Sequence, residues 1–366
     1  MLAHLQINNF RNFIQAELNP GNQFNVIYGL NGSGKTTILE AIHLLSCGRS
    51  FRTHLLNRTI HNEQEEFTLV GQIQAKEGLA SIGTRRHRNG EYQFKLAGKT
   101  VDSVTELAKV LPVQVIHPDS HRLLTDGPKL RRQLLDWGVF HVEHSFYSNW
   151  QWTQRALKQR NAEIKKSQSK QRVILWNKEF IESACILDKQ RRQYFEQFKP
   201  LFDQLVQTLL PHIPISFNYY SGWDTEFGLE TVLNQSINRD LELGYTQFGP
   251  QRADIKIKVD TIPAQDALSQ GQQKLLIYAL RLAQGQLYQQ VSYASPIYLI
   301  DDLPAELDIH KRQLVTQLLF SLKSQVFITG AEYVEMEDLI QSDTQLFHVE
   351  QGKITPKNLH KINKKQ

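Results

Sequence analysis

The feature that most constrains this chain is a glycine-rich turn at residues 29–36, which reads GLNGSGKT and matches the pattern G-x-x-x-x-G-K-[ST]. A short apolar run precedes it at residues 23–28, and a helical pattern follows it at residues 36–46. Glycines let backbone N–H groups converge on phosphate oxygens, and a helix that starts there directs its positive end at them. The sequence therefore predicts a strand–loop–helix unit that binds phosphate groups.

The residue types in this turn point to a nucleoside triphosphate with Mg²⁺. A lysine at position 35 can reach the β and γ oxygens, and the hydroxyl of Thr36 can ligate the metal ion. We expect the ligand to be held by Gly29, Leu30, Asn31, Gly32, Ser33, Gly34, Lys35, Thr36 and Thr37.

A second candidate element is an apolar run that ends in two carboxylates, IYLIDD at residues 297–302. We expect Asp301 to lie beside Thr36, on a neighbouring strand end, and to serve as a partner of Mg²⁺. Asp302 would then point toward the γ-phosphate, where it could act as the general base for an attacking water. Acidic residues are also common in turns, so this element gains weight only together with the glycine-rich turn.

A third element, LSQGQQK at residues 268–274, precedes a helical pattern. Ser269 and Gly271 could simply cap that helix. Alternatively, the Ser269 hydroxyl, the Gly271 backbone and the helix N-terminus could receive a γ-phosphate. If this element lies on a different lobe from Lys35, it would act on the nucleotide of a second subunit, and a dimer would close over two nucleotides.

Composition and periodicity predict an α/β protein with a helical second part. Apolar residues make up 40% and charged residues 22%, and no uninterrupted apolar run is long enough to cross a membrane. Two cysteines provide neither a disulfide framework nor a zinc site and favour the cytoplasm. Strand signals stop between about residues 129 and 210, where two helices joined near 167–171 would form an arm. We expect a first lobe made of residues 1–118 and 291–366 and a second made of residues 119–290.

Positive charge is concentrated in two stretches, although the net charge is only +5. Residues 155–172 hold seven Lys or Arg and one Glu, and residues 353–366 hold five Lys and no acid. Such runs attract a phosphate backbone, but a solvated helix face and a frayed tail would look the same. A basic shoulder also precedes a predicted hairpin turn at residues 89–90. The candidate DNA contacts are Arg85, Arg86, Arg88, Lys158, Arg160, Lys165 and Lys166.

Taken together, these elements resemble the motif set of an ABC-type ATPase. The correspondence is Walker A at 29–36, signature at 268–274, Walker B at 297–302 and D-loop at 305–308. The start, LQINNFRNF, is similar to that of SMC-like and RecF proteins, and RRQLLDW at 131–137 and GPQRAD at 249–254 are similar to motifs of the RecF family. The resemblance covers essentially the whole chain.

The resemblance to the RecF family implies an ABC-type ATPase head with a mixed sheet around the P-loop, plus a mainly helical lobe with a short arm. It implies ATP and Mg²⁺ as ligands, with Lys35, Asp302 and Ser269 as the catalytic set. It also implies an ATP-dependent homodimer, binding to single-stranded, double-stranded and gapped DNA, and partnership with RecR and RecO in loading RecA during repair, replication restart and SOS induction. ATP turnover would be slow and would time DNA release.

The chain departs from the expected pattern at several positions. Walker B ends in Asp302 where transport cassettes have Glu, no His follows the run at 325–329, and Gln251 stands where we expect His. Thr329 could replace the switch histidine, and Gln114 is a weak candidate for a Q-loop glutamine. A transporter cassette would carry its signature much closer to the P-loop, a small-molecule kinase has no use for LSQGQQK, and an SMC-type chromosome-maintenance ATPase would need a long coiled coil.

Overall fold

The computed structural model describes residues 1–75, 78–167, 169–340 and 343–357. The chain divides into two compact units, unit 1 comprising residues 1–120 and 292–366 and unit 2 comprising residues 121–291. No helix in the described ranges combines the length and apolarity needed to span a bilayer.

Unit 1 contains two six-stranded sheets. In the first, the order is β15-β14-β3-β13-β12-β8, and every pair is parallel except β14 with β15. Its strands are β3 (Phe24–Tyr28), β8 (Val113–Ile116), β12 (Ile297–Ile300), β13 (Val326–Gly330), β14 (Gln345–Glu350) and β15 (Lys353–Lys357). The four strands β3, β8, β12 and β13 are almost continuously apolar, as burial on both faces requires.

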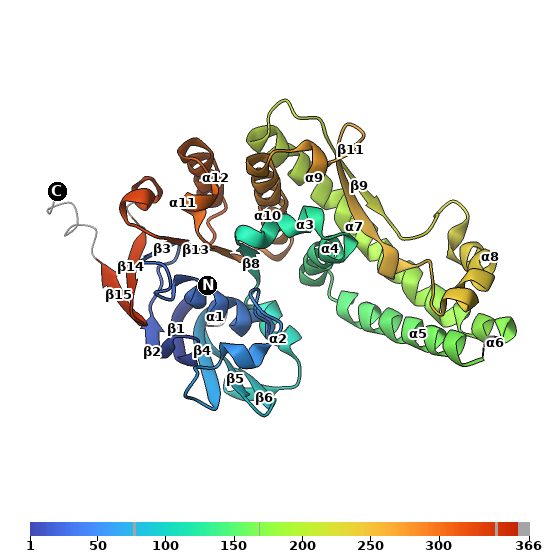
Figure 1. Cartoon of the computed structure of the whole chain (residues 1–366), viewed down its shortest axis with the longest axis horizontal. Helices are drawn as coiled ribbons and strands as arrows, with labels where there is room; N and C mark the ends of the chain where they lie inside the picture. Colours follow the sequence, from blue (N-terminus) through green and yellow to red (C-terminus); the bar gives the residue numbers. More distant parts are fainter. Residues whose placement is uncertain (76–77, 168, 341–342, 358–366) are drawn as a thin grey trace. The chain divides into compact units, whose positions relative to one another are not determined.

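The second sheet of unit 1 is antiparallel, with the order β2-β1-β4-β5-β6-β7. Its strands are β1 (Leu2–Phe10), β2 (Phe13–Leu18), β4 (Glu66–Ala75), β5 (Gly78–His87), β6 (Tyr92–Leu96) and β7 (Lys99–Val101). Helix α1 (Lys35–Cys47) follows the carboxyl end of β3 in the chain (Figure 1) and buries its apolar residues in one cluster with both sheets. Helices α2 (Val104–Val110), α11 (Leu303–Glu306) and α12 (Ile309–Ser321) complete the unit.

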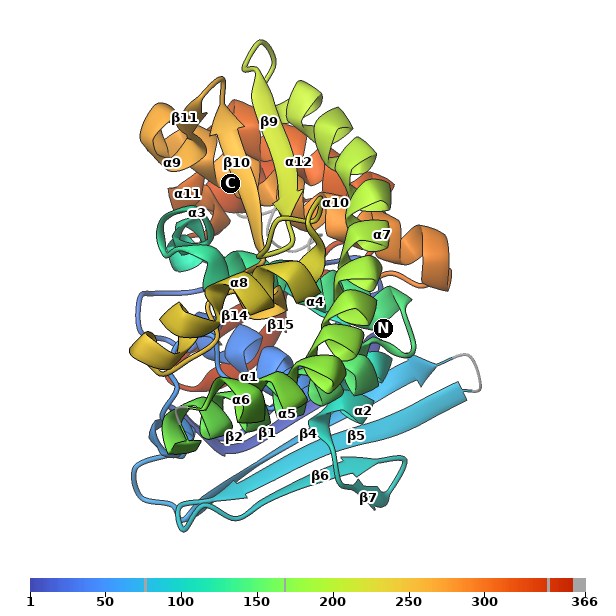
Figure 2. The same cartoon turned by 90° about the vertical axis from the view of Figure 1, so that its right-hand side faces the viewer.

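Unit 2 is mainly helical. Its helices are α3 (Arg122–Thr125), α4 (Pro128–Val142), α5 (Phe146–Ser167), α6 (Lys170–Leu175), α7 (Asn177–Leu209), α8 (Gly228–Leu243), α9 (Ala264–Ala267) and α10 (Gln270–Ser292). A small antiparallel sheet joins β9 (Ile215–Tyr220), β10 (Asp254–Val259) and β11 (Ile262–Pro263). Helices α5 and α7 run side by side as an arm (Figure 2), tied by the Trp152 indole to Glu179 at 2.9 Å.

The predicted α/β class with a largely helical second part is confirmed. The apolar run before the glycine-rich turn forms β3, and the apolar run before the two carboxylates forms β12. The alternative interpretation of the basic tail as a frayed end does not hold for residues 353–357, because they form β15 and pair with β14. Residues 358–366, the rest of that tail, lie outside the described residues.

Candidate nucleotide site and nucleic-acid surfaces

The glycine-rich loop between β3 and α1 depends on its glycines for conformation and for space. Gly34 has φ +119°, and a Cβ there would come within 2.8 Å of the Asn12 amide nitrogen and 2.9 Å of the Phe13 ring. The Asn12 amide donates to the carbonyl of Ser33 at 2.9 Å, so the turn between β1 and β2 supports the loop. Asn12 is a supporting residue that the sequence patterns did not single out.

Two polar groups in this loop fit phosphate oxygens. The Lys35 ammonium donates to the carbonyls of Gly29 and Leu30, at 2.6 and 3.0 Å. Burial lowers the Lys35 pKa from its usual value, and the nearby carboxylates of Asp302 and Asp301 oppose that shift. The Ser33 hydroxyl is buried without a hydrogen-bond partner among the described residues, which is costly unless a ligand supplies one. Two further predicted loop residues, Asn31 and Gly32, lie on the exposed turn. Thr37 is buried in the first turn of α1.

The acidic end of β12 meets the start of α1. The Thr36 hydroxyl lies 2.8 and 3.1 Å from the two carboxylate oxygens of Asp301, as the sequence led us to expect. The two residues do not follow neighbouring strands as expected, because β13 lies between β12 and β3 in the sheet. The hydroxyl and carboxylate oxygens side by side are the donor set that Mg²⁺ prefers.

Thr329, at the end of the intervening strand β13, connects the two acids. Its hydroxyl donates to Asp301 Oδ1 at 2.7 Å and accepts from the Asp302 backbone N–H at 2.8 Å. Asp302 adopts a left-handed backbone with φ +57°, which is strained for a residue other than glycine and is fixed here by that hydrogen bond. The proposed substitute for a switch histidine is therefore in direct contact with both acids. Gln114 is fully buried within β8.

The environment of Asp302 favours its protonated form more than water would. Burial raises its pKa above the ordinary value, the neighbouring Asp301 raises it further, and Lys35 opposes the shift. A carboxyl group with a raised pKa is a better proton acceptor when ionised, which is the property a general base needs.

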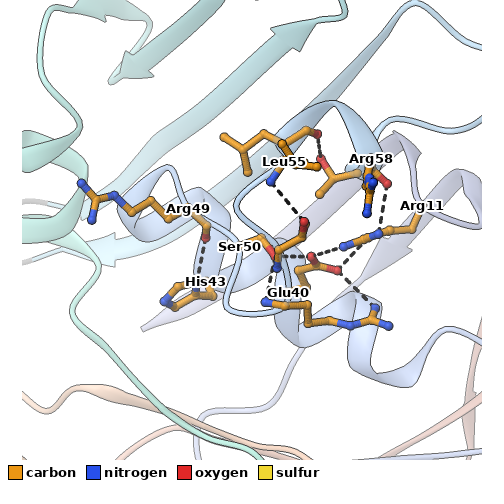
Figure 3. Close-up of polar contacts among 11 residues, drawn as sticks. Arg11, Glu40, His43, Arg49, Ser50, Leu55 and Arg58 are labelled. Atoms are coloured by element: carbon orange, nitrogen blue, oxygen red, sulfur yellow. Dashed lines mark hydrogen bonds and ion pairs between the residues drawn. The ribbon is translucent and has the colours of Figure 1, made fainter. Parts of the chain in front are cut away.

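A buried carboxylate supports the helix that carries the nucleotide loop. Glu40 on α1 is completely buried and receives the Arg11 guanidinium through two hydrogen bonds of 2.9 and 2.6 Å (Figure 3). The Ser50 hydroxyl and, at 3.3 Å, the Arg52 guanidinium also donate to it. The pairing ties α1 to the β1–β2 turn and to the segment after the helix. The sequence patterns missed Glu40, although an acid within an apolar helix face was a signal.

In unit 2, the segment before α10 forms a capping box. The Ser269 backbone N–H donates to the Gln272 side chain at 2.9 Å, and the Gln272 N–H approaches the Ser269 hydroxyl at 3.4 Å. Ser269 is exposed and Gly271 is half-buried. The capping role considered from the sequence is thus present, and the exposed hydroxyl and the start of a 23-residue helix remain accessible for an anion.

The prediction that Arg160 contacts DNA is wrong. Its side chain is fully buried, and its guanidinium donates to Asp240 at 2.8 Å and to Thr246 at 2.6 Å. Helical phase explains the error, because Arg160 lies on the inward face of α5 with Ala156 and Ile164, which are spaced four residues away on either side. The other three arm candidates, Lys158, Lys165 and Lys166, are exposed.

The three hairpin arginines differ from one another. Arg85 pairs with Glu66 on the adjacent strand at 2.6 Å. The Arg88 guanidinium donates to the carbonyls of Gln64, His61 and Asn62, so it holds the hairpin against that segment. The Arg86 guanidinium donates a long hydrogen bond of 3.4 Å to the Asn57 side chain.

The two segments that resemble RecF motifs meet inside unit 2. The Arg131 guanidinium pairs with the Asp254 carboxylate at 2.7 and 3.1 Å, and Arg132 donates to the carbonyl of Ala253 at 2.7 Å. Arg191 on α7 joins them, since it pairs with Asp136 and donates to the carbonyl of Pro250. These motifs therefore build a joint between α4, α7 and the start of β10.

Comparisons with known proteins agree with this architecture. The model of the RecF/RecN/SMC N-terminal domain matches residues 1–355. The DNA replication and repair protein RecF of Shewanella loihica is 44% identical over 97% of this chain and 99% of its own length. RecF of Pseudomonas syringae pv. tomato is 44% identical over 98% of this chain and 99% of its own. A solved structure of RecF with ATP, from the RecFOR pathway, is 25% identical with a TM-score of 0.84, covering 98% of this chain and 97% of that one. The predicted ABC-type head fold is thereby confirmed.

Proposed function

The chain belongs to the RecF family of DNA replication and repair proteins, and on this premise we propose that it is an ATP-dependent DNA-binding protein of recombinational repair and replication restart. In this proposal ATP drives homodimerisation, and the dimer binds single-stranded, double-stranded and gapped DNA in the cytoplasm. Slow hydrolysis then times DNA release. The protein acts with RecR and RecO in loading RecA and supports SOS induction.

The single observation that carries the proposal is the group of contacts among Thr36, Asp301 and Thr329, at the start of α1 and the ends of two strands. Lys35 would hold the β and γ oxygens, while the loop amides and the Ser33 hydroxyl would bind the remaining phosphate oxygens. Thr36 and Asp301 would hold Mg²⁺, which neutralises charge on the triphosphate. Asp302 would accept the proton of the attacking water.

The proposed division of labour gives unit 1 the triphosphate and unit 2 the signature serine. Ser269 would contact the γ-phosphate held by Lys35 of a second copy, so one nucleotide would be completed only in a dimer. Ser269→Arg, which places a long cation at this exposed position, should abolish the dimer and leave ATP binding largely intact.

The test is ATP hydrolysis with and without gapped DNA at several protein concentrations. The proposal predicts a slow hydrolysis rate per protein molecule that increases with protein concentration and with gapped DNA. Lys35→Ala should show no hydrolysis. A hydrolysis rate per protein molecule that is the same at all protein concentrations would contradict completion of the site by a second copy. Turnover that is indifferent to DNA would contradict the DNA-timed cycle.

A further inference from the structure

Unit 1 contains a hollow of about 320 Å³ that the nucleotide loop does not use. It lies between the end of α1, the strands β5 and β6, and the segment before α2. The volume is at the lower end of the range for small-molecule sites, which is enough for one nucleotide unit.

The floor of this hollow is uncharged. Phe67 and Leu44, which are almost fully buried, line it from β4 and α1. Cys47 also lines it, and burial raises the pKa of its thiol to about 11, so the thiol is neutral at physiological pH. An apolar floor favours a flat, weakly solvated group over a bare inorganic anion.

Two arginines, Arg49 and Arg86, are among the residues that line the hollow. Neither forms an ion pair with a carboxylate within the described ranges, in contrast to Arg85 with Glu66. In Figure 3 the Arg49 guanidinium points away from Glu40, in contrast to that of Arg11. The backbone carbonyl of Arg49 lies 2.8 Å from His43 Nδ1. Guanidinium groups that lack a carboxylate partner and face a hollow are suited to a phosphate.

Aromatic rings stand beside these cations. Tyr92 is 63% exposed, and its ring centroid lies 5.4 Å from that of the half-buried Phe94 on the same strand. Exposed aromatic rings next to basic groups are the usual platform for unpaired bases. The exposed carboxylate of Asp102 also lines the hollow and could accept from the amino or imino groups of a base.

We propose that this hollow takes one unstacked base, with its phosphate, from single-stranded DNA. The combination requires a ligand with an anionic group for the two arginines, a flat face for Tyr92 and N–H donors for Asp102, and a nucleotide carries all three. The inference rests on the proposed DNA-binding function and assigns to it a site for the single-stranded part of a substrate. A free mononucleotide shares this chemistry, so the experiment includes it as a competitor.

The test measures binding of the full-length protein, in the presence of ATP–Mg²⁺, to a labelled single strand and to a labelled duplex of equal length, by fluorescence anisotropy at fixed salt. Tyr92→Ala should weaken single-strand binding roughly 5- to 150-fold, the range measured for loss of one base–aromatic stack, and leave duplex binding unchanged. Tyr92→Phe keeps the ring and should bind like the wild type. Tyr293→Ala is the matched control, because Tyr293 is 89% exposed and does not line the hollow.

The outcomes separate this inference from the broader proposal. Wild-type protein that binds neither DNA contradicts the proposed function, and the inference fails with it. If the wild type binds DNA, two results for Tyr92→Ala would show that only the hollow is misassigned. In one, the variant binds both DNAs as well as the wild type does; in the other, its affinity for both DNAs falls by the same factor. If deoxyadenosine monophosphate displaces the labelled strand as effectively as unlabelled single strand at the same nucleotide concentration, the hollow binds a free nucleotide. That result would overturn its assignment to single-stranded DNA.

Discussion

Charged residues at the nucleotide site of unit 1 are used differently from the buried charged residues of unit 2. At the nucleotide site of unit 1, Lys35 contacts backbone carbonyls and Asp301 contacts two hydroxyls, and neither group forms a side-chain ion pair within the described ranges. In unit 2, Arg160 and Arg191 are buried against Asp240 and Asp136 and hold helices together. A binding site keeps its charges available at strand ends, whereas a helical scaffold pairs them internally. Charge counted along a sequence does not distinguish the two uses.

The largest expected effect tests the unit 1 side of this comparison. Asp302→Asn removes the proposed proton acceptor, so ATP turnover should fall about 10²- to 10⁴-fold while ATP binding persists. Asp260→Asn is a matched control, because Asp260 also has a left-handed backbone, with φ +52°, but is an exposed turn residue in unit 2. Single-turnover hydrolysis and equilibrium ATP binding measure the two quantities. Unchanged turnover in Asp302→Asn would remove this residue from the mechanism.

The next effect tests the unit 2 side. Arg160→Ala leaves the Asp240 carboxylate buried without its cation, and the free energy of unfolding should fall by about 3–5 kcal/mol. Lys158→Ala on the exposed face of the same helix should change it by less than about 0.5 kcal/mol. Denaturant titration gives both values. Arg160→Ala with wild-type stability and weakened DNA binding would restore Arg160 as a DNA-binding residue.

Acid should act on unit 2 through the half-buried histidine His141. Burial among Trp137, Phe140 and Tyr288 lowers the His141 pKa from 6.5 to about 3. The unfolded chain therefore binds a proton that the folded chain does not, so this contribution to stability is complete above about pH 6.5 and diminishes as the pH falls toward 3. His141→Phe should remove about one proton from the pH dependence of unfolding in that window. An unchanged slope would show that His141 titrates normally.

The smallest effect concerns the exposed face of the arm. Replacing Lys158, Lys165 and Lys166 by Gln should lower the salt dependence of DNA binding, with little change in stability. The slope of log affinity against log salt concentration should fall by up to roughly one unit for each phosphate that is no longer neutralised. An unchanged slope would place the DNA on other residues, such as those around Arg86.

Local sequence patterns predicted the fold better than the site. The loop at 29–36 and the apolar runs at 23–28 and 297–300 are determined by neighbours in sequence, so these strands and the nucleotide loop were predictable. Strand β14 was missed because its sequence, QLFHVE, is only half apolar and gives a weak strand signal. Arg160 was misassigned because charge was counted without helical phase. Phase alone would have placed it with Ala156 and Ile164.

The partners of Glu40 could not be predicted, because no motif links this residue to the segments that contact it. Glu40 looks like an isolated acid in an apolar helix until Arg11 and Arg52 are brought to it by the fold. The expected pair of Thr36 and Asp301 is in contact, because both follow strands of one parallel sheet whose carboxyl ends share an edge. Their role with Mg²⁺, like that of Ser269 in a second copy, stays a prediction.

The measurement that decides most is the mass in solution of the hydrolysis-deficient variant Asp302→Asn with ATP–Mg²⁺, with ADP–Mg²⁺, and with ATP after the further change Ser269→Arg. Light scattering during size-exclusion chromatography provides it. We expect Asp302→Asn to be a dimer with ATP–Mg²⁺ and a monomer with ADP–Mg²⁺. The variant that also carries Ser269→Arg should be a monomer with ATP. A monomer that binds ATP tightly, or a dimer indifferent to both nucleotide and Ser269, would contradict a nucleotide site shared between two copies.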